Sequence, residues 1–151
     1  MNYHNILVGT DGTVIMDAVF DKCTYLVRLM GATIHVAYVL DITGLGAQPI
    51  DATWGEMYVI VKSEARRFLK VAREALVKRG VAEASVTAIL LEGYPVEEMN
   101  AYVKDHAIDL SIIGTHGRKG LDRLLVGNLT DKLIRTATVQ CLSCTARKWA
   151  I

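Results

Sequence analysis

Residues 84–115, with the sequence ASVTAILLEGYPVEEMNAYVKDHAIDLSIIGT, decide the fold of this chain. The segment begins with an apolar, β-branched run over 84–93 that predicts a strand. Pro95 then stands in the first turn of a helix, where proline is favoured, and the following pattern predicts a helix over 95–107. A second apolar run over 108–115 predicts a buried strand. A strand, a helix and a strand in this order form a right-handed unit whose two strands run parallel.

The same alternation extends over the rest of the chain. Apolar runs predict strands, periodic apolar positions predict helices that end near Gly31 and Gly80, and a segment with two glycines and a proline predicts a loop. The expected strands are 4–10, 32–40 and 138–146, the expected helices 13–31, 56–80 and 128–137, and the expected loop 41–54. One strand after each helix indicates an α/β protein with a doubly wound, parallel, five-stranded sheet in the order 3-2-1-4-5.

Length and composition favour a single globular domain over 1–151. The chain has 151 residues, of which 52% are hydrophobic and 22% charged. A net charge of +1 creates no overall field that attracts nucleic acid or an anionic membrane, so an anion site has to be local. The N-terminus lacks the regions of a signal peptide, and no apolar run is long enough for a bilayer. We therefore expect a cytoplasmic protein without a nucleic-acid or membrane partner.

The three cysteines predict neither a disulfide framework nor a metal site. Cys23, Cys141 and Cys144 are odd in number and lack a framework spacing, which fits a reducing compartment. Cys141 and Cys144 form a C-x2-C pattern, but positions three apart in a strand face opposite sides of the sheet. No metal ligands are therefore predicted.

Two of the expected strands end in polar segments that contain glycine. The first strand runs into GTDGT (9–13) and the fourth into GTHGRKG (114–120). Ligands of open parallel sheets bind outside the carboxyl ends of the strands, where the strand order reverses. In the expected order these two strands are neighbours at that reversal, so both segments should line one pocket.

The second of these segments has the glycine spacing of an anion site. Gly114 and Gly117 allow a tight turn and a close approach of the backbone to a ligand. Gly127 and Asn128 begin the last expected helix, whose free N–H groups and dipole favour an anion, and Thr130 adds a hydroxyl. Three basic residues stand nearby: Arg118, Lys119 and Arg123. The segment predicts a phosphate cradle that matches neither the P-loop nor the G-x-G-x-x-G motif.

The chain resembles the universal stress proteins over essentially its whole length. Gly114, Gly117 and Gly127 match the G-x2-G-x9-G-[ST] pattern of ATP-binding members. The segment ILVGTDGT resembles the family's first strand and its aspartate, here Asp11, and RLLVGNLTDKLIRTA resembles the helix that follows the glycines. The resemblance implies an ATP-binding protein that acts in the stress response by nucleotide-dependent regulation. Hydrolysis should be slow at most, because the sequence places no general base or arginine finger, and no catalytic residues are predicted.

The resemblance also implies a role for each residue that matches the family's motifs. The residues at the adenosine would be Gly9, Thr10 and Asp11, with the backbone of Val39 at the adenine. The ribose and phosphate side would hold Gly114, His116 and Gly117, and the phosphates would meet Gly127, Asn128, Leu129 and Thr130. ATP would bind with Mg²⁺ or Mn²⁺ held mainly by the phosphates, and two chains would form a homodimer through the last strand.

Two departures from the family pattern leave an alternative open. Asn128 stands where the family has Ser or Thr, and its amide cannot copy the contact of a hydroxyl with a metal or phosphate. The last strand, TVQCLSC, lacks the family's aliphatic run. The alternative is a dimeric stress or interaction module of the same fold that binds no nucleotide. In that case Asp11 caps the first helix and the basic residues form a solvated loop.

Overall fold

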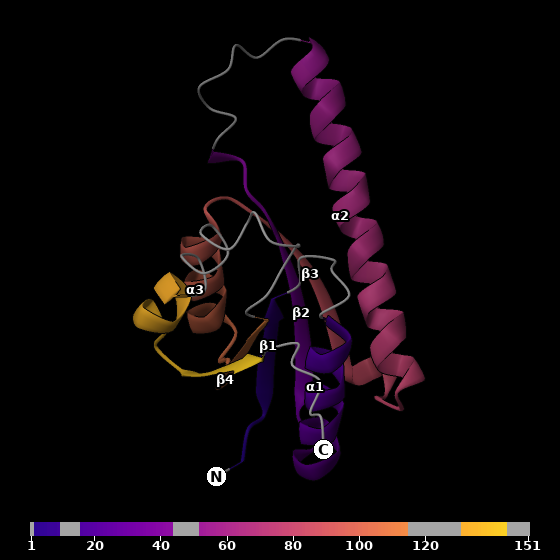
Figure 1. The fold of residues 1–151 in the computed structure, drawn as a ribbon, viewed down its shortest axis with the longest axis vertical. Helices are drawn as coiled ribbons and strands as arrows, with labels where there is room; N and C mark the ends of the chain where they lie inside the picture. Colours follow the sequence, from indigo (N-terminus) through magenta and orange to yellow (C-terminus); the bar gives the residue numbers. More distant parts are fainter. Residues whose placement is uncertain (1, 10–15, 44–51, 115–130, 145–151) are drawn as a thin grey trace, which may run out of the picture.

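The structure, a computed structural model, describes residues 2–9, 16–43, 52–114 and 131–144. Its elements follow the predicted alternation along the chain (Figure 1). The strands are β1 (Asn5–Gly9), β2 (Thr33–Leu40), β3 (Val86–Glu92), β4 (Leu110–Gly114) and β5 (Gln140–Cys144). The helices are α1 (Met16–Met30), α2 (Ala52–Lys78) and α3 (Pro95–Asp105), with the 3-10 turn η2 (Glu83–Ser85), and residues 131–136 are also helical.

The five strands form one parallel sheet in the order β3-β2-β1-β4-β5, which confirms the predicted topology. Ile6 of β1 lies opposite Ile34 of β2 on one side and opposite Leu110 of β4 on the other. The strand order therefore reverses at β1, because the chain first builds outward through β2 and β3 and then returns to add β4 and β5.

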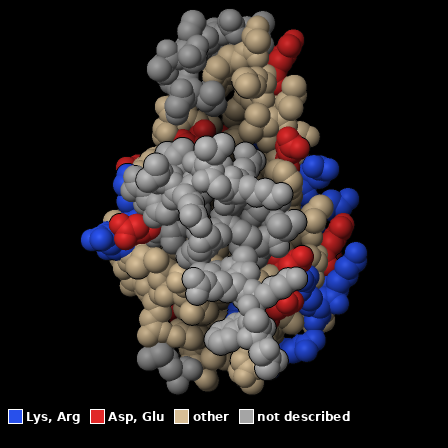
Figure 2. All heavy atoms as spheres, viewed as in Figure 1, with Lys and Arg blue, Asp and Glu red and all other residues tan. Residues whose placement is uncertain are grey.

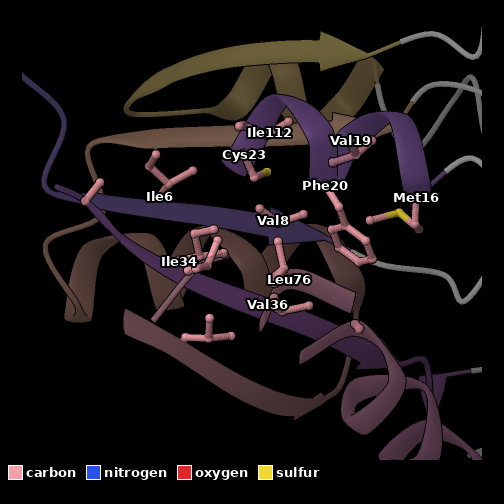
Figure 3. Packing of buried hydrophobic residues seen from close by; sticks show 14 of the residues in the cluster. Ile6, Val8, Met16, Val19, Phe20, Cys23, Ile34, Val36, Leu76 and Ile112 are labelled. Carbon is pink, nitrogen blue, oxygen red and sulfur yellow. The ribbon is translucent and has the colours of Figure 1, made fainter. Parts of the chain in front are cut away.

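Helices cover both faces of this sheet. On one face, α1 and α2 contribute Val19 and Leu76 to a core cluster with Val8 of β1 (Figure 3). On the other face, Met99 of α3 and Leu133 of the helical residues 131–136 belong to a second cluster. β1 supplies both clusters, since successive residues of a strand point to opposite faces. The predicted two-sided covering of the sheet is thereby confirmed.

Glycines with positive φ end the first two helices, as the sequence predicts. Gly31 has a φ of 69° and Gly80 a φ of 91°, a conformation that a Cβ disfavours. After α2, the N–H of Gly80 donates to the carbonyl oxygen of Val77, and the N–H of Val81 donates to that of Leu76. These hydrogen bonds satisfy carbonyl groups of the last helical turn and close the helix.

Some predicted boundaries were wrong. Residues 84–85, expected in a strand, belong to η2. α2 begins at Ala52, so residues 52–54 are helical rather than part of the expected loop. Trp54 stacks on Tyr58 one turn later, with ring centroids 5.5 Å apart and an angle of 4° between the ring planes. Residues four apart lie on the same side of a helix, so this aromatic pair stabilises the first turn. Gly55 weakens helix propensity at this point, and the local signal therefore favoured a loop.

α2 is longer than the strands it covers, and its N-terminal end projects beyond the sheet (Figure 1). Among the periodic apolar residues that predicted this helix, Ala65, Ala72 and Leu76 are buried, whereas Met57 and Val61 are exposed. The predicted amphipathic helix thus buries side chains against the sheet from Ala65 onward, and its first turns carry apolar residues beyond the core.

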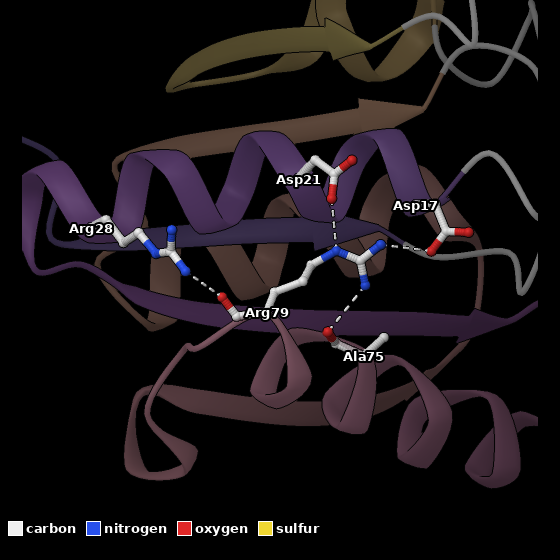
Figure 4. A network of polar contacts seen from close by, with 5 residues as sticks. All are labelled: Asp17, Asp21, Arg28, Ala75 and Arg79. Carbon is white, nitrogen blue, oxygen red and sulfur yellow. Dashed lines mark hydrogen bonds and ion pairs between the residues drawn. The ribbon is translucent and has the colours of Figure 1, made fainter.

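Arg79, directly after α2, joins α2 to α1 (Figure 4). Its guanidinium group donates hydrogen bonds of 2.8 Å to the carboxylates of Asp17 and Asp21 in α1. It also donates to the carbonyl oxygen of Ala75 at 3.0 Å, while Arg28 donates to the carbonyl oxygen of Arg79 at 2.7 Å. These contacts fix the two helices side by side on one face of the sheet.

The visible surface carries charges of both signs. Figure 2 shows Lys and Arg side chains next to Asp and Glu along the side that α2 forms, with few charges at the upper end of that helix. Surface ion pairs that involve α2 include Arg67 with Glu64, and Arg73 with Glu83 of η2. Among the helices in the described segments, none combines the length and hydrophobicity needed to cross a bilayer.

Candidate functional site

The carboxyl ends of β1 and β4 lie side by side at the point where the strand order reverses. β1 ends at Gly9 and β4 ends at Gly114. The two strands pair in parallel, with Val8 opposite Ile112. The segments predicted to line one pocket, 9–13 and 114–120, therefore start from adjacent strands.

Hydrogen bonds at the other end of the sheet hold β1 against β4. The carboxylate of Asp109, just before β4, accepts the backbone N–H of His4 at 2.7 Å and that of Asn5 at 3.1 Å. The N–H of Asp109 in turn donates to the carbonyl oxygen of Asn5 at 3.0 Å. These bonds set the register of the two strands, and so determine how Gly9 and Gly114 stand relative to each other.

Three of the expected binding residues lie in the described part of the chain: Gly9, Val39 and Gly114. The other expected binding residues lie outside it, namely Thr10, Asp11, His116, Gly117, Gly127, Asn128, Leu129 and Thr130, and so do the basic residues Arg118, Lys119 and Arg123. The roles of these residues stay predictions from the sequence.

The backbone groups of Val39 point toward the β1 side of β2. In a parallel sheet, alternate residues of a strand direct their N–H and C=O groups to alternate neighbours. The N–H of Thr33 donates to the carbonyl oxygen of His4, which precedes β1. The carbonyl oxygen of Leu40, by contrast, accepts the N–H of Gly93, which follows β3. The odd-numbered residues of β2 therefore face β1, and Val39 is one of them.

Val39 also extends past the end of β1. Gly9, the last residue of β1, lies opposite Ala37 of β2, two residues before Val39. The side chain of Val39 packs against the core cluster under α3, so it is the backbone that faces the edge. One N–H donor and one C=O acceptor are thus directed to the region beyond Gly9, next to the carboxyl end of β1.

Gly9 is explained by helix packing as well as by its place at this edge. A Cβ on Gly9 would lie 3.3 Å from the Cε atom of Met99 in α3. Met99 is buried in the cluster on that face of the sheet. Because carbon atoms pack best at about 3.5–4.0 Å, a side chain at this position would require Met99 to shift by a few tenths of an ångström. Contact with a ligand is not needed to account for this glycine.

A polar cluster that the sequence reading missed stands at the end of β3. Lys62 of α2 and Glu92 of β3 form an ion pair of 2.6 Å, the hydroxyl of Tyr58 donates to Glu92, and Lys62 donates to the Tyr58 oxygen at 3.1 Å. The hydrogen bond from Lys62, and then that from Tyr58, lowers the pKa of Glu92. The sequence signal for this cluster is that Tyr58 and Lys62 are four apart on a predicted helix and so lie on the same side of it. That spacing alone did not indicate which strand the pair faces.

A small hollow lies beside this cluster, between the end of β2 and the first turns of α2. Its volume is about 160 Å³, and its lining is formed by Leu40, Asp41, Trp54, Met57, Tyr58 and Val61. Asp41 is held in a turn, since its carboxylate accepts the N–H of Thr43 at 3.0 Å. Pockets for small molecules usually measure about 300–1,000 Å³, so this hollow alone is too small for a nucleotide.

The cysteines of the C-x2-C pattern face opposite sides of the sheet, as predicted. Cys141 packs against the cluster under α3, whereas Cys144 belongs to the cluster under α1 and α2. Burial raises the pKa of these two thiols and of the Cys23 thiol. The two cysteines of the pattern therefore do not point toward a common ligand.

Several known proteins are similar to this chain. The model of the universal stress protein family matches residues 2–144. Universal stress protein MJ0531 of Methanocaldococcus jannaschii is 25% identical over 135 residues, which is 89% of this chain and 78% of that protein. The solved structure of hypothetical protein MJ0577 has a TM-score of 0.80 at 21% identity and covers 98% of this chain and 99% of that one.

Two further solved structures of this fold contain ligands. A universal stress protein in complex with cAMP has a TM-score of 0.66 at 17% identity, covering 95% of this chain and 97% of that one. The universal stress protein from Archaeoglobus fulgidus in complex with dAMP has a TM-score of 0.67 at 18% identity, covering 95% and 98%. The family match includes all five strands and both faces of the sheet, and this chain belongs to the universal stress protein family.

Proposed function

We propose that this protein binds an adenine nucleotide, ATP in the first instance, at the carboxyl edge of the sheet between β1 and β4. The observation that carries this proposal is the adjacency of Gly9 and Gly114 where the strand order reverses. Ligands of doubly wound sheets bind at such a point, and both strands lead there into segments that contain glycine.

The proposed contacts divide the nucleotide between the two segments. The adenosine meets Gly9, Thr10 and Asp11, and the ribose and phosphate side meets Gly114, His116 and Gly117. The phosphates meet Gly127, Asn128, Leu129 and Thr130, where the N–H groups of a helix start favour an anion. When bound, Mg²⁺ or Mn²⁺ would neutralise phosphate charge, with the phosphates as its main ligands.

The edge of β2 fits an adenine base. Adenine offers an amino group as donor and ring nitrogens as acceptors along its edges. The N–H and C=O groups of Val39 point to the region beyond Gly9, where they can pair with such an edge. This contact would read the base through the backbone, and it therefore tolerates a change of the Val39 side chain.

The ligands of related structures support an adenine nucleotide as the ligand class. Two proteins of this fold are solved with cAMP and with dAMP, which share the adenine and a sugar phosphate with ATP. We infer a regulatory role, in which occupancy shifts the population that meets a partner protein, with at most slow hydrolysis. A second candidate is a stress or interaction module that binds no nucleotide, and Asn128 in place of Ser or Thr is the observation in its favour.

Titration calorimetry with ATP and Mg²⁺ tests the proposal on the full chain. We expect measurable heat and a raised melting temperature, both lost in Gly117→Val, because a Cβ there intrudes on the ligand while the fold stays intact by circular dichroism. Gly55→Val is the matched control and keeps the affinity within about twofold, since Gly55 lies in α2 outside the proposed site and a Cβ there meets nothing within 4 Å. Absence of heat and of a thermal shift at millimolar ATP would favour the second candidate.

Two further substitutions separate the parts of the proposed site. Asp11→Ala should weaken the binding of adenosine as well as that of ATP. A loss of stability with unchanged affinity would instead assign Asp11 to helix capping. Asn128→Ser should raise the affinity for ATP and leave the affinity for adenosine unchanged, because a hydroxyl is the family's group at that position. Equal affinity of Asn128→Ser and the parent protein for ATP would show that residue 128 does not contact the phosphates.

Pairing of two chains through β5 is the oligomeric arrangement that we propose with this function. β5 is the last strand of the described sheet, with β4 on one side. An edge strand presents N–H and C=O groups that another strand can pair with. Leu142 on β5 is 40% exposed. Leu142→Lys should lower the mass measured by sedimentation velocity, and an unchanged mass would argue against this arrangement.

A further inference from the structure

The face of α2 that is turned away from the sheet carries a stripe of four exposed residues: Ile60, Glu64, Arg67 and Val71. They are separated by four, three and four positions, so they follow one line along the helix. Ile60 is 65% exposed and Val71 is 56% exposed, while the side chains of Glu64 and Arg67 are 54% and 68% exposed. Leu69 and the other residues that α2 buries in the core lie on the opposite side of the helix.

We propose that α2 pairs with α2 of a second copy of this chain, in antiparallel orientation, through this stripe. A two-fold axis between positions 65 and 66 brings Ile60 onto the partner's Val71 and Glu64 onto the partner's Arg67. Each contact occurs twice, because a two-fold interface is isologous. A spacing of four, three and four is that of core positions in helix pairs that cross at about 20°.

The charges of the stripe select this orientation. Within one chain, Glu64 and Arg67 already form an ion pair of 3.4 Å. In the antiparallel pair, each gains a second neighbour of opposite charge from the other chain. In a parallel pair with the same residues in contact, Glu64 would face the partner's Glu64 and Arg67 would face the partner's Arg67, and like charges repel. The arrangement is therefore self-complementary in only one direction.

The apolar residues at the two ends of the stripe supply the attraction. Pairing removes Ile60 and Val71 of both chains from water, and each would lie on an apolar partner. The stripe is about 17 Å long and only one side chain wide, so it buries much less than the roughly 800 Å² per partner of a standard interface. We therefore expect an association that is weak and depends on concentration.

This surface is separate from the edge strand β5. α2 packs against β2 and β3, whereas β5 closes the sheet at the other end of the order β3-β2-β1-β4-β5. A dimer paired through β5 would expose two α2 stripes, so pairing of α2 would increase its mass further. Pairing through the stripe does not depend on nucleotide binding, because no part of the stripe belongs to the proposed nucleotide site.

Exchanging the charges of Glu64 and Arg67 in the full chain tests the pairing. Sedimentation velocity over a concentration series into the submillimolar range measures the association. Glu64→Arg and Arg67→Glu should each weaken the association by about tenfold or more, because each places like charges in contact twice. The two single variants mixed in equal amounts should associate with each other, and the variant that carries both substitutions should regain the association of the parent protein. Ile60→Asp should abolish it.

Lys70→Glu is the matched control, since Lys70 is exposed on the same helix but off the stripe and the change alters the net charge as Arg67→Glu does. We expect its association to equal that of the parent protein. Circular dichroism and melting temperature establish that every variant is folded. Single variants that associate like the parent protein, or a double variant that does not recover, would overturn the pairing.

Discussion

Asp109 and Asn5 are joined by two hydrogen bonds that run in opposite directions. The N–H of Asn5 donates to the Asp109 carboxylate at 3.1 Å, and the N–H of Asp109 donates to the carbonyl oxygen of Asn5 at 3.0 Å. The same carboxylate accepts the N–H of His4 at 2.7 Å. This relationship holds the first strand beside the fourth, and the proposed nucleotide edge at the opposite end depends on it.

Asp109→Ala should therefore destabilise the protein. Two backbone N–H groups lose an ionised acceptor, which costs about 1–2 kcal/mol for a half-buried carboxylate. Urea unfolding measures the effect, and Asp105→Ala is the control because that side chain is exposed at the end of α3. An equal free energy of unfolding for the two variants would contradict the role of Asp109.

Gly9→Val should destabilise the protein through a clash with α3. The added side chain would meet the Cε atom of Met99, and overpacking of this kind costs about 1–3 kcal/mol. Met99→Ala in the same chain should recover part of the loss, because it opens space at that point. In contrast, Gly55→Ala should stabilise α2 by about 0.5–1 kcal/mol, since a Cβ on Gly55 meets nothing within 4 Å. Full stability of Gly9→Val would refute the packing argument.

Arg79→Ala should loosen α2 from α1. The substitution removes the hydrogen bonds to Asp17, Asp21 and the carbonyl oxygen of Ala75, for a loss of about 1–2 kcal/mol after allowance for the exposure of both carboxylates. Arg67→Ala is the control, because its ion pair with Glu64 is on the surface and should contribute less than about 0.5 kcal/mol. Chemical denaturation distinguishes the two, and similar losses would contradict the prediction.

His35 should make stability depend on pH below neutrality. Burial, and then the charge of His106, lowers the pKa of His35 from its ordinary value of 6.5. As the pH falls below 6.5, the unfolded chain takes up the proton before the folded protein does, so the free energy of unfolding decreases. His35→Gln should reduce this dependence in urea unfolding at pH 5 and pH 7.5. An identical loss of stability in both proteins would assign the pH dependence to other groups.

Much of the fold could be predicted from local patterns. Apolar runs and helical periodicity indicated each strand and helix. The alternation of strands and helices then indicated parallel strands, and the order followed the common pattern of doubly wound sheets. Gly31 and Gly80 were predicted as helix stops and do adopt positive φ. The start of α2 was not predicted, because the contact between Trp54 and Tyr58 outweighs the weak helix propensity of Gly55.

The candidate site was less accessible to sequence reasoning. The adjacency of Gly9 and Gly114 followed from topology, but the packing of Met99 against Gly9 required the position of α3. The cluster of Tyr58, Lys62 and Glu92 requires the end of β3 to meet one particular turn of α2. Neither contact produces a periodic pattern in the local sequence.

By itself, the sequence determined which segments become strands and helices, their parallel order and the edge at which β1 and β4 end. These features depend on residues close together in the chain and on the handedness of L-amino acids. Only the tertiary structure decided that Asn5 meets Asp109, that Arg79 clamps α1 to α2, and that α2 projects beyond the sheet with Ile60 exposed. Those contacts depend on the register and separation of packed elements, which residues far apart in the chain determine jointly.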